Sequence, residues 1–299
     1  RPLGIPTMKD RAMQALYLMA LEPVSETTAD TRSYGFRKER CCMDAVQQCH
    51  NILRKGYSPE WILEGDIKGC FDHISHEWLL ANIPMDKAIL RKWLKCGYVF
   101  NKQMFPTEEG TPQGGIISPT LANMTLDGLQ KALADRYKRH HVNGKLYSPM
   151  VNLVRYADDF SIYCKSHNQA KATRVVIEKF LKNKLKLTIN EEKSGIRKPI
   201  HFTILGFGFV PTYEKGSKNQ YQLIVSEKAW KKLKERLKTI TRKTTPATFE
   251  ERIAKIKEVQ RGWLNYFQGT SILGKLRDLD GWLRNRLRYC IWHHWKKPE

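Results

Sequence analysis

The chain has 299 residues, of which 41% are hydrophobic and 27% charged, a composition that is typical of a globular protein and excludes a disordered one. Its formal net charge of +22 favours a polyanionic partner, with nucleic acid as the first candidate. A membrane surface is the alternative, but no apolar run approaches the roughly 20 residues that span a bilayer. The seven cysteines form no C-x-x-C pair, which argues against zinc and disulfides and for the reduced thiols of a cytosolic protein.

The N-terminal region predicts a helix and then a short aromatic segment. The apolar spacing indicates a helix with Asp10 as its N-cap and Pro23 at its end. Farther on, Tyr34, Phe36 and Arg37 lie close together in the chain. These three side chains could stack on and clamp a template base or backbone, whereas the two aromatic rings could equally pack into the core.

Two strands that end in carboxylates are the most informative pattern. Residues 61–67 form a short apolar run that reaches Asp66, and residues 151–164 form two apolar runs around Asp158 and Asp159, which predicts a tight β-hairpin. A pair of aspartates in a turn is commonly just solvated. Here, however, two strands can deliver carboxylates to one edge of a sheet, and this arrangement suits two divalent cations and phosphoryl transfer.

A glycine-rich loop over residues 110–119 precedes a predicted helix. Its glycines allow the backbone to approach a ligand closely, and Ser118-Pro119 is a typical helix start. The apolar stripe that follows predicts one helix that continues through Leu133. A glycine-rich loop that leads into a helix N-terminus is a general phosphate-binding arrangement of low specificity.

The last part of the chain predicts mostly helices. A helix is expected over residues 167–187 and a glycine-punctuated aromatic strand over 202–209, and the polar stretch 213–222 marks the expected domain boundary. Three basic amphipathic helices follow, with Ser226 and Thr248 as predicted N-caps of the first two. Basic helix faces are often only solvated, but three in succession with interleaved tryptophans favour a nucleic-acid cradle.

Several of these sequences resemble one family. The tetrad Tyr-Ala-Asp-Asp at 156–159 resembles the signature of reverse transcriptases, and residues 66–71 resemble the other catalytic palm motif. Residues 112–119 resemble the glycine-rich block of the reverse transcriptase/maturase proteins encoded by bacterial group II introns. Residues 261–267 and 279–288 resemble the maturase-specific thumb of the same proteins, which other reverse transcriptases do not carry.

The resemblance, which covers nearly the whole chain, implies an α+β fold with the right-hand arrangement of polymerases. Residues 1–215 would form the fingers and a palm with an antiparallel sheet, and residues 216–299 would form a helical thumb, the maturase-specific domain. In this family an N-terminal extension precedes the fingers. We expect the chain to be a piece of a longer protein from which that extension is missing.

The resemblance also implies a two-metal active site. Asp66, Asp158 and Asp159 would be catalytic and would hold two Mg²⁺ ions together with the carbonyl of Ile67, with Mn²⁺ as a substitute. Phe71 could instead simply pack into the core, and Lys193 could simply lie in a turn at the surface. The implied nucleotide contacts are Arg1 at the triphosphate, Phe71 as a gate against the ribose 2′-hydroxyl, and Ile67, Gln113, Ala157 and Lys193. The implied primer and template contacts are Tyr34, Phe36, Arg37, Leu205, Gly206, Trp263 and Arg284.

The implied activity is RNA-directed DNA synthesis in the bacterial cytosol or nucleoid, away from membranes. Its partners would be an intron RNA template, a DNA or RNA primer and deoxynucleoside triphosphates, with a homodimer as an open alternative to a monomer. RNA binding would also assist splicing and mobility of the intron. One alternative is an RNA-binding splicing maturase core with little polymerase activity in this piece. Another is a domesticated or defence-associated reverse transcriptase, against which the maturase-like thumb argues.

Overall fold

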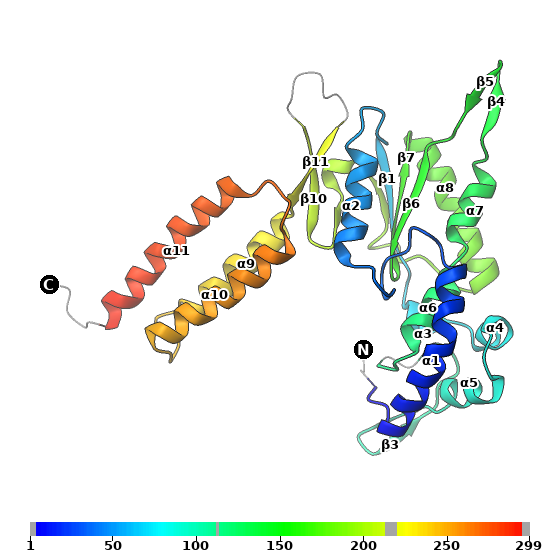
Figure 1. Ribbon diagram of the computed structural model, residues 1–299, viewed down its shortest axis with the longest axis horizontal. Coiled ribbons are helices and arrows are strands. Elements are labelled where there is room, and N and C mark those ends of the chain that lie inside the picture. Colours follow the sequence, from blue (N-terminus) through cyan, green and yellow to red (C-terminus); the bar gives the residue numbers. More distant parts are fainter. Residues whose placement is uncertain (1–3, 112–113, 213–219, 295–299) are drawn as a thin grey trace. The chain divides into compact units, whose positions relative to one another are not determined.

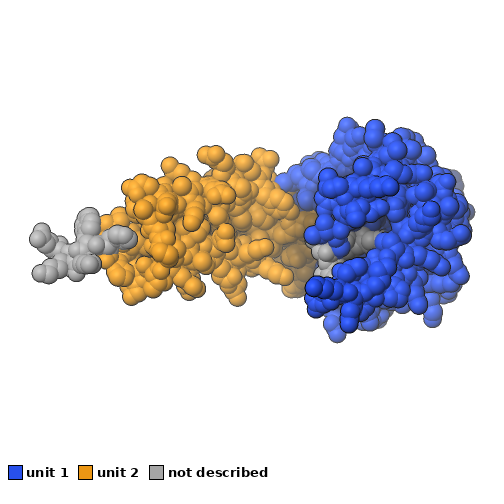
Figure 2. Space-filling model, turned by 90° about the horizontal axis from the view of Figure 1, so that it is seen from below, with its two compact units in different colours: residues 1–199 blue, residues 200–299 orange. Residues whose placement is uncertain are grey.

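The computed structural model describes residues 4–111, 114–212 and 220–294, so Arg1 and Gln113 lie outside the described residues. The chain forms two compact units, residues 1–199 and 200–299, which Figure 2 shows in separate colours. Each unit has a hydrophobic core of its own. The domain boundary at residue 215 stays a prediction, because most of the stretch around it lies outside the described residues.

The first unit is built on a four-stranded antiparallel sheet with the strand order β6-β7-β1-β8 (Figure 1). The predicted hairpin is formed by β6 and β7, and β1 ends at Asp66 as predicted. Helix α2 packs against β6, and α8 packs against β1 and β7. The strands are β1 Trp61–Asp66, β6 Val151–Tyr156, β7 Asp159–Cys164 and β8 Gly195–Arg197.

Helices and two short hairpins complete the first unit. The apolar faces of most of these helices join the sheet in one core, in which Leu63, Ile67 and Ile162 are buried, whereas β2 and β3 are exposed. The helices are α1 Met8–Thr28, α2 Cys42–Leu53, α3 Cys70–His73, α4 His76–Asn82, α5 Lys87–Leu94, α6 Ser118–Leu126, α7 Leu129–Arg136 and α8 His167–Phe180, which continues as a π-helical turn, η1 Leu181–Leu185. The hairpins are β2 Tyr98–Phe100 with β3 Gln103–Phe105, and β4 His140–Val142 with β5 Lys145–Tyr147.

The first helix, α1, differs from its prediction at both ends. Its N-cap is Thr7 rather than Asp10, because the Thr7 hydroxyl oxygen accepts a hydrogen bond of 3.2 Å from the Asp10 amide. The helix also continues past Pro23, which was expected to end it. Leu21 and Ser25, on either side of the proline, are both buried, so packing on both sides holds the helix together despite the missing amide donor.

The helix predicted from Ser118 through Leu133 is interrupted in the structure. Helix α6 ends before Asp127 and α7 begins after Gly128, whose φ of 102° is a conformation that glycine adopts without strain. The break turns the Asp127 carboxylate toward the interior, where it accepts a hydrogen bond from Arg155. A continuous helix could not present this carboxylate in the same way.

The second unit combines a small antiparallel sheet, with the order β11-β10-β9, and three helices. Ser226 and Thr248 cap the first two helices as predicted, the second in a capping box with Glu251. The α+β class with a helical C-terminal region is thus confirmed. The elements are β9 Thr203–Ile204, β10 Phe207–Pro211, β11 Tyr221–Val225, α9 Glu227–Ile240, α10 Phe249–Tyr266 and α11 Leu273–His294, and a short 3₁₀ turn, η2 Pro199–His201, precedes them. The helical core consists of Leu233, Leu237, Ile256, Leu279 and Leu283.

Candidate functional site

Three aspartates converge at one end of the sheet in the first unit. Asp66 is the last residue of β1, and Asp159 is the first residue of β7. The antiparallel register places these two residues directly opposite each other. Asp158 lies in the two-residue turn that joins β6 to β7. The structure therefore brings together the three residues that the sequence singled out as catalytic.

The turn that carries Asp158 has an unusual backbone. Ala157 adopts a left-handed conformation with φ of 56°, which costs a non-glycine residue on the order of 1 kcal/mol or more. Gly35 packs directly against this turn, since a Cβ atom at position 35 would lie 2.4 Å from the Ala157 nitrogen. Only glycine leaves room for the turn at that position. Gly35, which is buried, thus lies directly against the turn that carries Asp158.

A loop after α8 surrounds Asp66. The Asn190 side-chain amide donates to Asp66 Oδ2 at 2.9 Å, and the Asn190 backbone amide donates to the Asp66 carbonyl at 2.8 Å. The Asp66 amide in turn donates to Ser194 Oγ at 3.0 Å. Lys193, which was expected near the active site, places its Nζ 3.3 Å from Asp66 Oδ2. Asp66 is therefore held in place by hydrogen bonds and faces one ammonium group.

Negative charge is crowded at this end of the sheet. The pKa of Asp159 is raised to about 6, first because its carboxylate loses part of its water shell, and then because the charges of Asp158 and Asp66 repel it. Lys193 acts in the opposite direction. A carboxylate in this position gains from a nearby cation, because a cation offsets the repulsion that raises the pKa.

The donor set fits magnesium. Within the described ranges, no three His, Cys, Asp or Glu side chains are arranged closely enough to hold a metal ion by themselves. Carboxylate oxygens are nevertheless the donors that Mg²⁺ prefers, and proteins usually supply one or two of them while substrate phosphates and water complete its coordination. Ile67, whose carbonyl was expected to join the set, is buried immediately after Asp66 and forms an isolated bridge with Ile189.

The predicted sugar gate, Phe71, lies close to this end of the sheet in α3. Its carbonyl accepts a hydrogen bond of 2.7 Å from the Thr111 amide. Gly110 has φ of 85° and packs so tightly that a Cβ atom there would lie 2.6 Å from the Phe71 carbonyl oxygen. The Phe71 ring meets the Phe36 ring edge-on, with 6.2 Å between the centroids. The start of the glycine-rich loop therefore fixes Phe71, while Gln113 in the same loop lies outside the described residues.

The segment predicted to clamp a template divides into two kinds of residue. Phe36 is 58% exposed with φ of 57°, and the Tyr34 ring is covered by the guanidinium of Arg40 at 5.4 Å. Arg37, by contrast, is buried, and its guanidinium bonds the carboxylate of Glu26 and the carbonyl of Asp30. The expectation for Arg37 is corrected accordingly: it anchors its own segment, because its donors are used inside the protein.

The residues predicted to grip the primer lie in the second unit. Leu205 and Gly206 form the turn between β9 and β10, with φ values of 51° and 86°. The Tyr266 hydroxyl donates to the Leu205 carbonyl at 3.0 Å. A Cβ atom at position 206 would lie 3.2 Å from the Phe267 ring, so glycine lets the turn pack closely against the end of α10.

The predicted contacts on the thumb helices also differ from each other. The Trp263 ring packs between Trp230 and Phe267, with centroid distances of 4.6 and 4.7 Å, and so belongs to the helical core. Arg284 is exposed and forms an ion pair with Asp280 one turn away. Around them, α9 presents exposed basic side chains: Lys228, Lys231, Lys232, Lys234, Arg236 and Lys238.

Two residues that hydrogen-bond Asp66 were missed by the sequence analysis. Asn190 and Ser194 position Asp66, although they are separated from it by 124 and 128 residues in the chain. Both lie within three residues of Lys193 in the chain, but nothing in their local sequence indicates that their side chains turn toward β1.

Comparison with known proteins agrees with this geometry. Residues 1–209 match the family described as "Reverse transcriptase (RNA-dependent DNA polymerase)". The chain belongs to the reverse transcriptase family. Residues 230–299 match the "Group II intron, maturase-specific domain", which confirms the resemblance found in the thumb sequences.

Curated relatives of the chain include intron-encoded proteins. "Group II intron-encoded protein LtrA" of Lactococcus lactis subsp. cremoris is 32% identical over 253 residues, which cover 66% of this chain and 42% of LtrA. "Protein YkfC" of Escherichia coli (strain K12) is 32% identical over 225 residues, which cover 66% of this chain and 59% of YkfC. The chain thus spans about half the length of these relatives.

Solved structures also show similarity. Telomerase from Candida albicans, in complex with a fragment of telomeric RNA, aligns with a TM-score of 0.48 at 12% identity and covers 94% of this chain and 51% of that one.

In the part of the chain that the structure describes, no helix is long and apolar enough to cross a membrane.

Proposed function

We propose that this chain catalyses RNA-directed DNA synthesis as the polymerase core of a group II intron-encoded protein. The primer 3′-hydroxyl attacks the α-phosphate of a deoxynucleoside triphosphate, and pyrophosphate leaves. The observation that carries this proposal is the strand register that sets Asp66 opposite Asp159, with Asp158 in the adjoining turn. The family match over residues 1–209 supports it.

The three carboxylates would hold two Mg²⁺ ions, for which Mn²⁺ can substitute. Bound Mg²⁺ favours the ionised primer hydroxyl and neutralises charge that develops on the leaving pyrophosphate. Asp66 and Asp158 would hold one ion, and Asp66, Asp159 and the Ile67 carbonyl the other. Asn190 and Ser194 keep the Asp66 carboxylate and backbone in one orientation, so that little reorganisation is needed when substrate arrives.

Other described residues would select and bind the substrates. Phe71 would exclude the ribose 2′-hydroxyl by steric clash, since its backbone is fixed by Thr111 and its ring by Phe36. Phe36 and Tyr34 would contact the template, and Leu205-Gly206 the primer. Recognition of the RNA–DNA duplex would depend on backbone shape and charge, and we expect it to weaken strongly with salt.

A role in splicing is the second proposal, and the maturase-specific match over residues 230–299 favours it. The exposed lysines of α9 supply a basic surface on that domain. We infer that the thumb, residues 216–299, also binds intron RNA and so assists splicing and mobility in the bacterial cytosol. Polymerisation and RNA binding can coexist in one chain, because the carboxylates and the basic helices belong to different units.

Primer extension tests the polymerase proposal. The chain is incubated with Mg²⁺, deoxynucleotides and a DNA primer annealed to an RNA template, beside a double variant with Asp158→Asn and Asp159→Asn. We expect extension by the wild type and none by the variant. Absence of extension by a wild-type chain that still binds the RNA tightly would favour the splicing role alone.

A further inference from the structure

A fully buried arginine lies directly beneath the catalytic turn. Arg155 is the residue before Tyr156 at the end of β6, and its side chain is 0% exposed. Its backbone is tied to the neighbouring segment, because its amide donates to the Arg32 carbonyl and its carbonyl accepts from the Tyr34 amide, both at 2.9 Å. Such burial is exceptional for arginine, whose charge is costly to remove from water.

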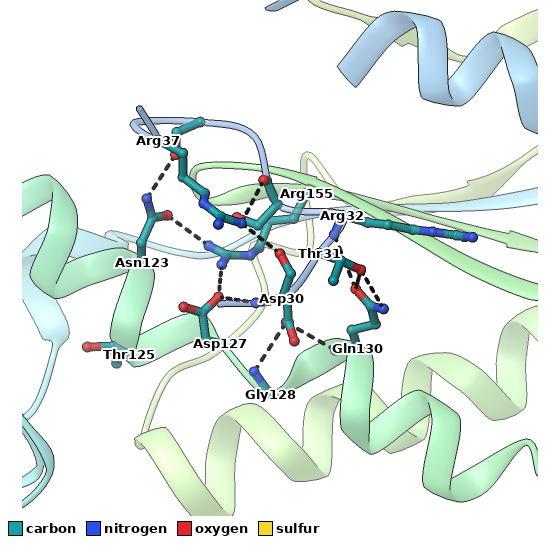
Figure 3. A network of polar contacts seen from close by, with 12 residues as sticks. Asp30, Thr31, Arg32, Arg37, Asn123, Thr125, Asp127, Gly128, Gln130 and Arg155 are labelled. Carbon is teal, nitrogen blue, oxygen red and sulfur yellow. Dashed lines mark hydrogen bonds and ion pairs between the residues drawn. The ribbon is translucent and has the colours of Figure 1, made fainter. Parts of the chain in front are cut away.

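The guanidinium of Arg155 reaches the turn itself. One terminal nitrogen donates to the Ala157 carbonyl at 3.2 Å and to Asn123 Oδ1 at 3.1 Å, and the other donates to Asp127 Oδ1 at 2.6 Å. Figure 3 shows Arg155 between Asn123 and Asp127, above Asp30. The Ala157 carbonyl is that of the left-handed residue immediately before Asp158.

The partners of Arg155 are themselves fixed by residues far away in the chain. The Asn123 amide nitrogen donates to the Gly35 carbonyl at 2.8 Å. The same asparagine therefore holds both Arg155 and Gly35, which packs against the turn. Asp127 Oδ1 also accepts from the Asp30 amide at 3.2 Å. Three segments, around residues 30–37, 123–128 and 155–157, thus meet in one polar network (Figure 3), which reaches the turn through the Ala157 carbonyl.

Stability alone does not explain this network. A buried ion pair is generally no more stabilising than well-packed apolar side chains of similar volume. Arg155 Nε and Asp127 Oδ2 are moreover buried without a hydrogen-bond partner among the described residues, which adds a desolvation cost. What the network supplies and an apolar core could not is a hydrogen bond to the carbonyl of the strained turn.

We propose that Arg155 is a positioning residue for nucleotidyl transfer: its guanidinium holds the Ala157 carbonyl and so fixes the turn that presents Asp158 and Asp159 to Asp66. Arg155 acts through this turn and does not itself touch the substrates. The inference rests on the proposed polymerase function. It predicts a loss of rate that is separate from any loss of stability.

A double variant separates the two effects. Arg155→Met alone leaves the Asp127 carboxylate buried and unpaired and is expected to unfold easily. Combining it with Asp127→Asn removes both charges, while the amide side chain introduced at position 127 keeps an oxygen that can accept from the Asp30 amide. We expect the double variant to melt within a few degrees of the wild type, to keep its KM for deoxynucleotide within about twofold, and to lose about 100-fold in kcat, which is typical of a misplaced catalytic group.

Two further variants complete the test. Leu90→Ala opens the core at α5 and should lower the melting temperature without changing kcat at a temperature where it is folded. Arg155→Lys keeps the charge opposite Asp127 but not the forked geometry that also reaches Ala157, so we expect its kcat to fall with KM unchanged. If the double variant does not fold, Arg155→Lys shows whether Arg155 affects kcat separately from stability.

The outcomes distinguish the inference from the function on which it rests. If the double variant, or Arg155→Lys in its place, regains the wild-type kcat once it is stably folded, Arg155 is merely structural and the inference is overturned. If the wild type itself extends no primer, the proposed function fails and the inference fails with it. A wild type that extends, beside folded variants that bind nucleotide but react slowly, supports both.

Discussion

The charge of Asp66 at the end of β1 is fixed in position, whereas the charges of the α9 lysines are free to move. The Asp66 side chain is 15% exposed, and Asn190 and Ser194 fix its carboxylate and its amide. The α9 lysines are exposed, and an exposed ammonium on a flexible stem keeps most of its conformational freedom. The first arrangement suits a reaction that needs fixed geometry, and the second suits attraction to a polyanion. Substitutions in the two units should therefore change different quantities.

The largest effect should come from Asp66. Asp66→Asn removes the charge shared by both proposed metal sites, and we expect the extension rate to fall by about 1,000-fold or more. Asn190→Ala removes only the amide that donates to Asp66 Oδ2, and the rate should fall by about 10- to 100-fold. Single-turnover extension measures both. Asn82→Ala, which removes an amide of the same kind at the surface of α4, is the control and should leave the rate unchanged.

Replacing Phe71 should change the choice between deoxynucleotides and ribonucleotides. Phe71→Ala removes the ring proposed to exclude the 2′-hydroxyl, and we expect discrimination against ribonucleotides, measured as a ratio of kcat/KM values, to fall by about 10- to 100-fold. Phe36→Ala removes the edge-on support of that ring, together with a proposed template contact, and should reduce discrimination by less. An unchanged ratio in both variants would return Phe71 to the role of core packing.

The exposed lysines should affect affinity in a manner that depends on salt. Replacing Lys228, Lys231 and Lys232 with glutamine should weaken binding to an RNA–DNA duplex. The slope of log K against log salt concentration should become shallower by about one for each lysine that contacts a phosphate. Filter binding over a series of salt concentrations measures the slope.

A matched set of lysines separates local contacts from net charge. Lys171, Lys179 and Lys182, on α8 and the turn that follows it, are also exposed, and replacing them with glutamine changes the net charge equally. This second triple variant should leave the slope as in the wild type. Equal slopes in the two triple variants would indicate that the thumb helix has no special part in binding.

Asp127 should make the stability of the fold depend on pH. Burial raises its pKa from 3.8 to about 6, although Arg155 acts in the opposite direction, and Asp30 and Arg37 also face it. Between these two pH values the native state binds more protons than the unfolded state. The free energy of unfolding should therefore fall as pH rises through this window, by at most about 3 kcal/mol. Urea unfolding of the wild type and of the Arg155→Met, Asp127→Asn double variant at pH 4.5 and 7 should show a flatter dependence in the variant.

The catalytic end of the sheet was predictable because its signals are local. The apolar runs around Asp158-Asp159 specify two strands, whose antiparallel pairing follows from the short turn between them, and the apolar run before Asp66 specifies a third strand. Helix caps such as Ser226 were predictable for the same reason, since a cap depends on a few adjacent residues. The family match confirmed the assignment made from these motifs.

What supports these motifs was not predictable. Arg155, Asn123 and Asp127 meet only after the chain has folded, and none of them stands in a pattern that indicates burial of its polar atoms. Pro23 was expected to end α1 because proline lacks the amide hydrogen that a helix interior uses. Packing on both sides of Pro23 nevertheless holds the helix together. Trp263 has the same sequence signature whether it stacks on a base or, as here, packs in the helical core.

One measurement tests the separation of chemistry from binding most directly. The single-turnover extension rate and the Kd for an RNA–DNA duplex are measured together for the wild type and for the double variant with Asp158→Asn and Asp159→Asn. We predict that extension disappears in the variant while the Kd stays within about twofold of the wild type, because its basic helices are unchanged. Extension that persists in the folded variant would contradict the assignment of the catalytic centre to the end of this sheet.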